Sequence, residues 1–122
     1  MKKLLLLGAL TGSILAKNPV YICTESIVTQ ADGSYKVFNN VRVPVAILPK
    51  NLLIYITDDK QYVLDKKDSD KTTDGVPYIV YGSNDESTMA AVYDKMKQGV
   101  RIIFRSGGEV RLSKCKYEKD LD

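Results

Sequence analysis

Short runs of β-favouring residues, separated by turn signals, make up most of the chain from about residue 20 onward. The runs 20–29 and 34–38 flank an Asp-Gly pair at 32–33, and this combination predicts a β-hairpin. The Asn pair at 39–40 tolerates positive φ, so we expect a second tight turn there. Further strands are predicted at 41–47, 52–57, 61–64, 76–81, 100–105 and 110–117.

Two segments depart from this strand pattern. Residues 65–75 contain no apolar side chain and end in Asp-Gly, so they predict a solvated loop. Residues 84–98 carry helix signals: Ser83 and Glu86 match a capping box, and Gly99 stands where a left-handed cap belongs. We therefore expect one late helix at about 84–98. Its apolar positions, at spacings of three and four, are Met89, Val92, Tyr93 and Met96.

The predicted strands follow one another through short connections, and no strand-helix alternation is sustained. This order favours antiparallel pairing over a doubly wound sheet. The predicted fold class is mainly β with a minor α component. We expect a small antiparallel β-barrel or sandwich-like sheet of about 7–8 strands, with the helix covering one opening or face. The polar tail after residue 116 is expected to fray.

The first sixteen residues follow a different pattern. Two lysines precede an apolar run, and Thr11, Gly12 and Ser13 follow it before Ile14, Leu15 and Ala16. This order is typical of a bacterial secretory signal peptide, and its apolar part is too short to span a bilayer. The sequence therefore predicts a signal peptide at 1–16 and a single β-rich domain at 17–122, in the periplasm or secreted. We expect no stable membrane insertion after cleavage.

Charge and histidine content exclude several function classes. Removal of Lys2 and Lys3 with the leader lowers the net charge from +3 to +1, and a nucleic-acid binder would carry a larger excess. The chain contains no histidine, which excludes Ser-His and Cys-His catalysis and histidine-ligated zinc. Asp58 and Asp59 form a carboxylate pair, but in a predicted turn with nothing to raise a pKa. We expect neither enzymatic activity nor a cofactor.

The chain contains two cysteines, Cys23 and Cys115, near the two ends of the predicted domain. Two thiols without histidine cannot complete a zinc site, although Lys114 and Lys116 could stabilise a reactive thiolate. An even cysteine count in a small exported chain predicts a structural disulfide, with two free buried thiols as the alternative. Cys115 does not share strand parity with Leu112. A bridge therefore requires a bulge near Ser113 or a sulfur on the other face of the sheet.

Basic residues accumulate in the last third of the chain and offer a candidate binding surface. If residues 106–109 form a turn, the arginines on the two flanking strands come close together. Such a patch suits an acidic protein, an anionic envelope polymer or phosphate, whereas the alternative is an ordinary solvated sheet face. The eight tyrosines suit either a recognition surface or half-buried strands. The candidate basic patch consists of Arg101, Arg105, Arg111, Lys114 and Lys116.

Three carboxylates in the predicted loop are weak candidates for a metal site. Asp68, Asp70 and Asp74 have a spacing at which side chains of a flexible loop can converge on calcium. An EF-hand template that starts at Asp68 fails, because Thr73 occupies the position of the turn glycine. Neighbouring lysines also neutralise much of the charge. We therefore expect a solvated loop and no metal.

The two ends of the domain resemble a known family. Tyr21-Ile22-Cys23 and Cys115 are similar to the two ends of small periplasmic inhibitors of C-type lysozyme, which are compact β-barrels. Gly75 and Tyr78 resemble part of that family's Gly-x-x-Tyr segment, although Asp74 stands where the family has serine. The resemblance implies a barrel architecture and an inhibitory function as one alternative.

These observations favour an exported, non-enzymatic binding or accessory protein of the bacterial periplasm. Its expected partner is another envelope or secreted protein. One alternative is an inhibitor of a secreted enzyme, similar to the lysozyme inhibitors, that inserts the segment 65–75 into an active-site cleft. The other alternative is a hydrolase with a carboxylate mechanism.

Overall fold

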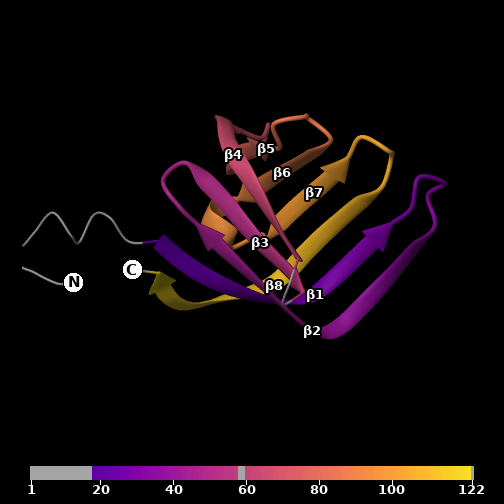
Figure 1. Ribbon diagram of the computed structural model, residues 1–122, viewed down its shortest axis with the longest axis horizontal. Helices are drawn as coiled ribbons and strands as arrows, with labels where there is room; N and C mark the ends of the chain where they lie inside the picture. Colours follow the sequence, from indigo (N-terminus) through magenta and orange to yellow (C-terminus); the bar gives the residue numbers. More distant parts are fainter. Residues whose placement is uncertain (1–17, 58–59, 122) are drawn as a thin grey trace, which may run out of the picture.

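Successive antiparallel strands close into a barrel (Figure 1). Apolar side chains that alternate along these strands form its core. The computed structural model describes residues 18–57 and 60–121, and each of their eight strands pairs with its sequence neighbours. The expectation of a mainly β fold is confirmed, and the sheet is a barrel. The elements are β1 (Asn18–Thr29), β2 (Tyr35–Ile47), β3 (Asn51–Thr57), β4 (Lys60–Lys71), β5 (Pro77–Gly82), β6 (Thr88–Tyr93), the 3₁₀ turn η1 (Asp94–Met96), β7 (Val100–Phe104) and β8 (Glu109–Leu121).

The barrel interior is filled by side chains from most of the strands. Each member of the central cluster is at most 2% exposed. Complete burial of a large aliphatic or aromatic side chain contributes about 1.5 to 3 kcal/mol to folding. The cluster comprises Cys23, Val45, Leu52, Ile54, Leu64, Tyr81, Ala90, Val92, Met96, Val100, Ile102 and Leu112.

The pairing of the first strand with the last closes the barrel. β1 and β8 run side by side along nearly their whole lengths, from the pair Thr29 and Glu109 to the pair Asn18 and Leu121 (Figure 1). The expectation of a frayed tail is therefore wrong. The polar residues among 117–121 lie on the ladder because β1 supplies partners for their backbone groups. The predicted signal peptide at 1–16 lies outside the described residues, as do Asp58 and Asp59.

The first hairpin forms around Asp32 and Gly33 as expected, but β2 does not turn at its asparagine pair. Asn40 does have a positive φ of 63°. The strand nevertheless continues, and the register against β1 shifts between Cys23 and Glu25. The tolerance of asparagine for positive φ thus produces a β-bulge and not a turn, because β2 pairs with β1 on both sides of this position.

The polar segment 65–75 is not a loop throughout. β4 continues to Lys71, and its last residues pair with β5, where Lys71 lies opposite Pro77. A short turn follows, closed by the hydrogen bond from the Gly75 N–H to the Thr72 carbonyl (2.9 Å). The absence of apolar residues therefore indicates that this part of the strand is exposed to solvent. Its extended conformation is fixed by pairing with β5.

The helix expected at about 84–98 is absent, and its place is taken by β6 and the single turn η1. Ser83 and Asp85 cap a turn: the Ser83 hydroxyl accepts the Thr88 N–H, and the Asp85 carboxylate accepts the Ser87 N–H. Burial in β6 alternates, with Thr88, Ala90 and Val92 buried. Strand pairing to β5 and β7 therefore outweighed the helical spacing of the apolar residues.

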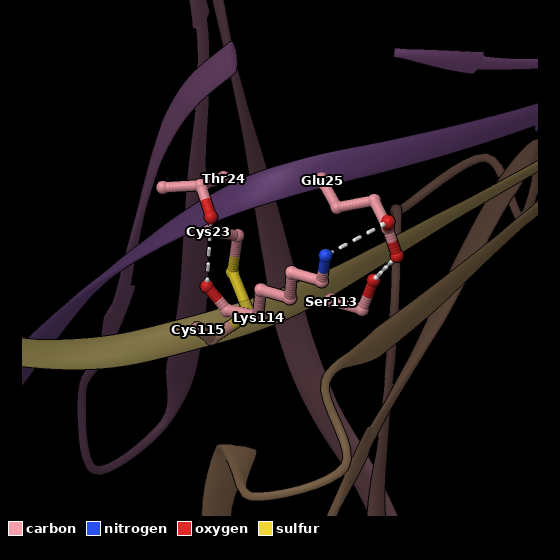
Figure 2. The surroundings of a disulfide bond; sticks show 6 residues. All are labelled: Cys23, Thr24, Glu25, Ser113, Lys114 and Cys115. Atoms are coloured by element: carbon pink, nitrogen blue, oxygen red, sulfur yellow. Dashed lines mark hydrogen bonds and ion pairs between the residues drawn. A yellow bond between two sulfur atoms is a disulfide. The ribbon is translucent and has the colours of Figure 1, made fainter. Parts of the chain in front are cut away.

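The disulfide between Cys23 and Cys115 is present and joins β1 to β8 (Figure 2). Leu112 and Cys115 both pack on the core although their parity differs. The change of parity occurs at Lys114, which has a positive φ of 54° and whose carbonyl accepts the Thr24 hydroxyl at 3.3 Å. The irregularity expected near Ser113 therefore lies one residue further along the strand.

Removal of the disulfide is expected to destabilise the barrel substantially. The bridge links residues 92 positions apart, and closing a loop of this length contributes about 3 to 5 kcal/mol in the chain-entropy model. The double variant Cys23→Ser/Cys115→Ser should lose about this amount in urea unfolding relative to the oxidised protein. Intact mass before and after reduction gives the control, since the oxidised chain must be lighter by two hydrogens. An unchanged unfolding midpoint on reduction would contradict the prediction.

The turn before β6 should make stability depend on acid pH. Hydrogen bonds from the Ser83 hydroxyl, and from the backbone and hydroxyl of Ser87, lower the pKa of Asp85 from 3.8 to about 2. A lowered folded-state pKa stabilises the protein above the unfolded value, and this stabilisation is lost as pH falls through the folded value. The wild type should therefore unfold at a higher temperature than Asp85→Asn at pH 6. This difference should shrink between pH 4 and pH 2, and a difference independent of pH would refute the assignment.

Candidate functional site

A half-open cavity of about 620 Å³ lies at one end of the barrel. This end, called the open end below, is where β1 begins, β4 ends and β5 begins, and where η1 lies. At the opposite end, the partly buried rings of Tyr62 and Phe104 pack against the core with their centroids 6.0 Å apart. The apolar wall of the cavity comes from four strands, β1, β2, β5 and β6, and includes Tyr21, Ile47, Tyr78, Ile79, Tyr81 and Val92.

The floor of the cavity is buried and poor in polar partners. Tyr81 and Val92 are 1% and 2% exposed, respectively. Burial raises the pKa of the Tyr81 hydroxyl. Desolvation is the cause of this shift, and no hydrogen bond to residues 18–57 or 60–121 contributes to it.

The rim of the cavity, in contrast, is polar and exposed. The end of β4 contributes Ser69, Asp70 and Lys71, and η1 contributes Lys95. The Asp70 carboxylate accepts the backbone N–H of Lys71 at 2.8 Å. The two lysines make no ion pair with any residue that the structure describes.

The turn η1, which lies at the open end, has an unusual backbone conformation. Asp94, Lys95 and Met96 have φ values of 49°, 51° and 80°, and left-handed conformations cost non-glycine residues roughly 1–2 kcal/mol each. Met96 is 1% exposed and anchors the turn in the core, while Lys95 reaches the rim. Gly99 follows with φ 84°, and a Cβ at this position would collide with the Leu112 carbonyl. Tight packing against β8 therefore maintains the turn.

The structure brings together two of the predicted basic residues and places a carboxylate between them. Arg101 and Arg111 lie directly opposite each other on β7 and β8. The Glu109 carboxylate accepts a hydrogen bond from Arg101 at 2.8 Å and lies 3.8 Å from Arg111. The hydrogen bond to Glu109 raises the pKa of Arg101. Much of the positive charge of this pair is therefore compensated.

The other predicted basic residues are dispersed. Arg105 lies 3.9 Å from Glu86 at an exposed turn. Lys114 lies 3.5 Å from Glu25, whose carboxylate also accepts the Ser113 hydroxyl at 2.6 Å (Figure 2). Lys116 is exposed on β8 next to the disulfide. A binding role for the predicted basic patch stays a prediction.

The weak metal candidates do not converge. The Asp68 and Asp70 carboxylates each accept the N–H of the following residue at 2.8 Å, and Asp74 lies in the turn beyond β4. Among residues 18–57 and 60–121, no three histidine, cysteine or acidic side chains are placed to hold a metal ion.

The two alternative functions depend on two different segments of the chain. Most of the proposed inhibitory segment 65–75 is strand, so only the turn at 72–76 is free of strand pairing. The carboxylates suggested for a hydrolase, Asp58 and Asp59, fall outside the described residues. Both alternatives remain predictions.

The patterns in the sequence do not predict the cavity itself. The one available signal was the set of tyrosines on inward strand positions, such as Tyr21 on the parity of Cys23 and Tyr81 within an apolar run. A large side chain with a polar tip suits a cavity wall as well as a half-buried strand.

Comparisons with protein-family models, curated proteins and solved structures give no match for this chain. What the molecule itself defines is an eight-stranded, up-and-down β-barrel with a half-open cavity. Of the residues described, no helical segment reaches the length and apolarity that crossing a membrane requires.

Loss of the bridging carboxylate should expose the positive charge of the arginine pair. In Glu109→Gln, Arg101 and Arg111 keep their facing positions without a counter-charge, so the local potential becomes more positive. The variant should elute from a heparin column at higher salt than the wild type. Asp74→Asn removes the same charge from an exposed turn and serves as the control. Equal elution of the two variants would show that the local compensation by Glu109 is unimportant.

Proposed function

We propose that this protein is a non-enzymatic binding protein that takes up a small, largely apolar molecule at the open end of its barrel. The observation that carries the proposal is the cavity of about 620 Å³ with its wall of tyrosine and aliphatic side chains. Ligand pockets commonly have volumes of about 300–1,000 Å³ and predominantly apolar walls. Barrels of about eight strands are wide enough to hold one small ligand.

The distribution of polar groups supports retention of a ligand over catalysis. Polar side chains lie at the exposed rim, and the floor is formed by Tyr81 and Val92. The chain contains no histidine to serve as a general base. A rigid wall, fixed by strand pairing on both sides, lowers the entropic cost of binding.

The setting of this function is proposed to be the periplasm or the exterior of a bacterial cell. The disulfide is typical of proteins that reside outside the cytoplasm. The leader-like pattern of residues 1–16 supports export. In this setting the protein captures or carries its ligand, and the envelope protein expected as a partner would receive or supply it.

A neutral fluorescent probe tests the proposal. N-phenyl-1-naphthylamine should bind the oxidised protein saturably, with one probe per barrel and an increase in emission. Ile79→Trp places a large side chain in the cavity and should weaken probe binding about tenfold. The matched control is Ile103→Trp, because Ile103 is 42% exposed on the outside of β7 and should leave the affinity unchanged.

The chain has no natural tryptophan, so each variant also carries a unique reporter. Probe binding should quench the tryptophan emission of the Ile79→Trp variant more strongly than that of the Ile103→Trp variant, since only the first position adjoins the cavity. Circular dichroism verifies that both variants fold. Non-saturable binding by the wild type, or equal affinity of the two variants, would overturn the proposed function.

A further inference from the structure

The cavity has one apolar side and one charged side. Its wall includes Ile47, Ile79 and Val92, whereas exposed charged side chains occupy its rim. A molecule that fits both regions is an amphiphile, with an apolar body inside and a polar group at the mouth. The sign of the charge at the rim determines which polar group fits.

The rim carries an excess of positive charge. Lys71 enters it from the end of β4, and Lys95 enters it from η1. Asp70 is the acidic side chain that lines the cavity, and one of its oxygens already accepts the Lys71 backbone N–H at 2.8 Å. Asp94 precedes Lys95 on η1 without lining the cavity. The described residues that line the mouth therefore include two lysines and one aspartate.

The two rim lysines differ from most residues of the predicted basic patch. Arg101, Arg105 and Lys114 each have a carboxylate within 4 Å. Lys71 and Lys95 have no such partner among residues 18–57 and 60–121. Their charge is thus available to a ligand, beside an apolar wall that strengthens electrostatic attraction relative to open solvent.

The backbone of η1 places Lys95 at the mouth. The three successive residues Asp94, Lys95 and Met96 have positive φ, and the buried Met96 side chain fixes the turn against the core. Strained backbone that is held by its surroundings is frequently associated with ligand sites.

We infer that the ligand is an apolar acid, a molecule with one anionic group on an apolar body, whose anionic group lies between Lys71 and Lys95. This inference rests on the proposed function and names its ligand class. An ammonium group forms short, charge-assisted hydrogen bonds with a carboxylate. An alcohol with the same apolar body keeps the contacts with the wall and loses this attraction.

Competition between an acid and an alcohol of equal chain length tests the inference. Dodecanoate and 1-dodecanol, both kept below the concentrations at which they aggregate, should displace N-phenyl-1-naphthylamine from the oxidised wild-type protein. Dodecanoate should do so at about tenfold lower concentration at low ionic strength, and higher salt should reduce this preference. Lys71→Gln/Lys95→Gln should remove most of the preference for the acid.

A second double variant controls for overall charge. Lys66→Gln/Lys97→Gln removes two exposed lysines from β4 and from the residue after η1, and neither of them lines the cavity. It should retain the wild-type preference for dodecanoate. Equal loss of preference in both double variants would show a general charge effect and overturn the inference.

The result also separates the inference from the proposed function. Saturable probe binding with equal competition by acid and alcohol would overturn the anionic ligand and leave the binding barrel in place. Absence of saturable probe binding by the wild type would overturn the proposed function, and the inference with it.

Discussion

The pairing of β1 with β8 is the constraint on which the rest of the molecule depends. A meander of antiparallel strands has two free edges, and each edge exposes unpaired backbone groups to other chains. Here the ladder from Asn18 with Leu121 to Thr29 with Glu109 joins these edges, and the Cys23–Cys115 disulfide makes the junction covalent. The contact is long in sequence separation, so its entropic cost is high, and the disulfide lowers that cost by restricting the unfolded chain.

Closure also decides where space remains inside. With eight strands the interior is narrow, and at one end the partly buried rings of Tyr62 and Phe104 pack against the core. At the open end, the chain covers the barrel with the single turn η1, and Met96 is the side chain of that turn buried in the core. Within the segment 84–98, Val92 on β6 and Lys95 on η1 line the cavity.

Local signals in the sequence predicted the elements whose conformation is decided locally. The Asp32-Gly33 hairpin is one example, and the disulfide followed from the cysteine count and the expected compartment. The errors share one physical cause, since each of them concerns a segment whose neighbours in the sheet overrode its own preference. Asn40 took its positive φ inside a strand, and the polar end of β4 paired with β5. The cavity was beyond prediction because it depends on which side chains from five strands meet at one end.

The fold also distinguishes the arginine pair on β7 and β8 from the two lysines at the mouth of the cavity. Sequence position grouped Arg101 and Arg111 as a patch, and the barrel indeed places them opposite each other, but the Glu109 carboxylate lies within reach of both. Exposed ion pairs of this kind add little to stability, since solvent screens them, yet they reduce the positive potential that a partner would meet. Lys71 and Lys95 are distant in sequence and are joined only by the fold, at the mouth of an apolar cavity. A charge beside an apolar wall is screened less than a charge on an open sheet face, so its contribution to recognition is larger. Under the proposed function, selectivity for a ligand is better attributed to Lys71 and Lys95 at the mouth of the cavity than to the predicted basic patch.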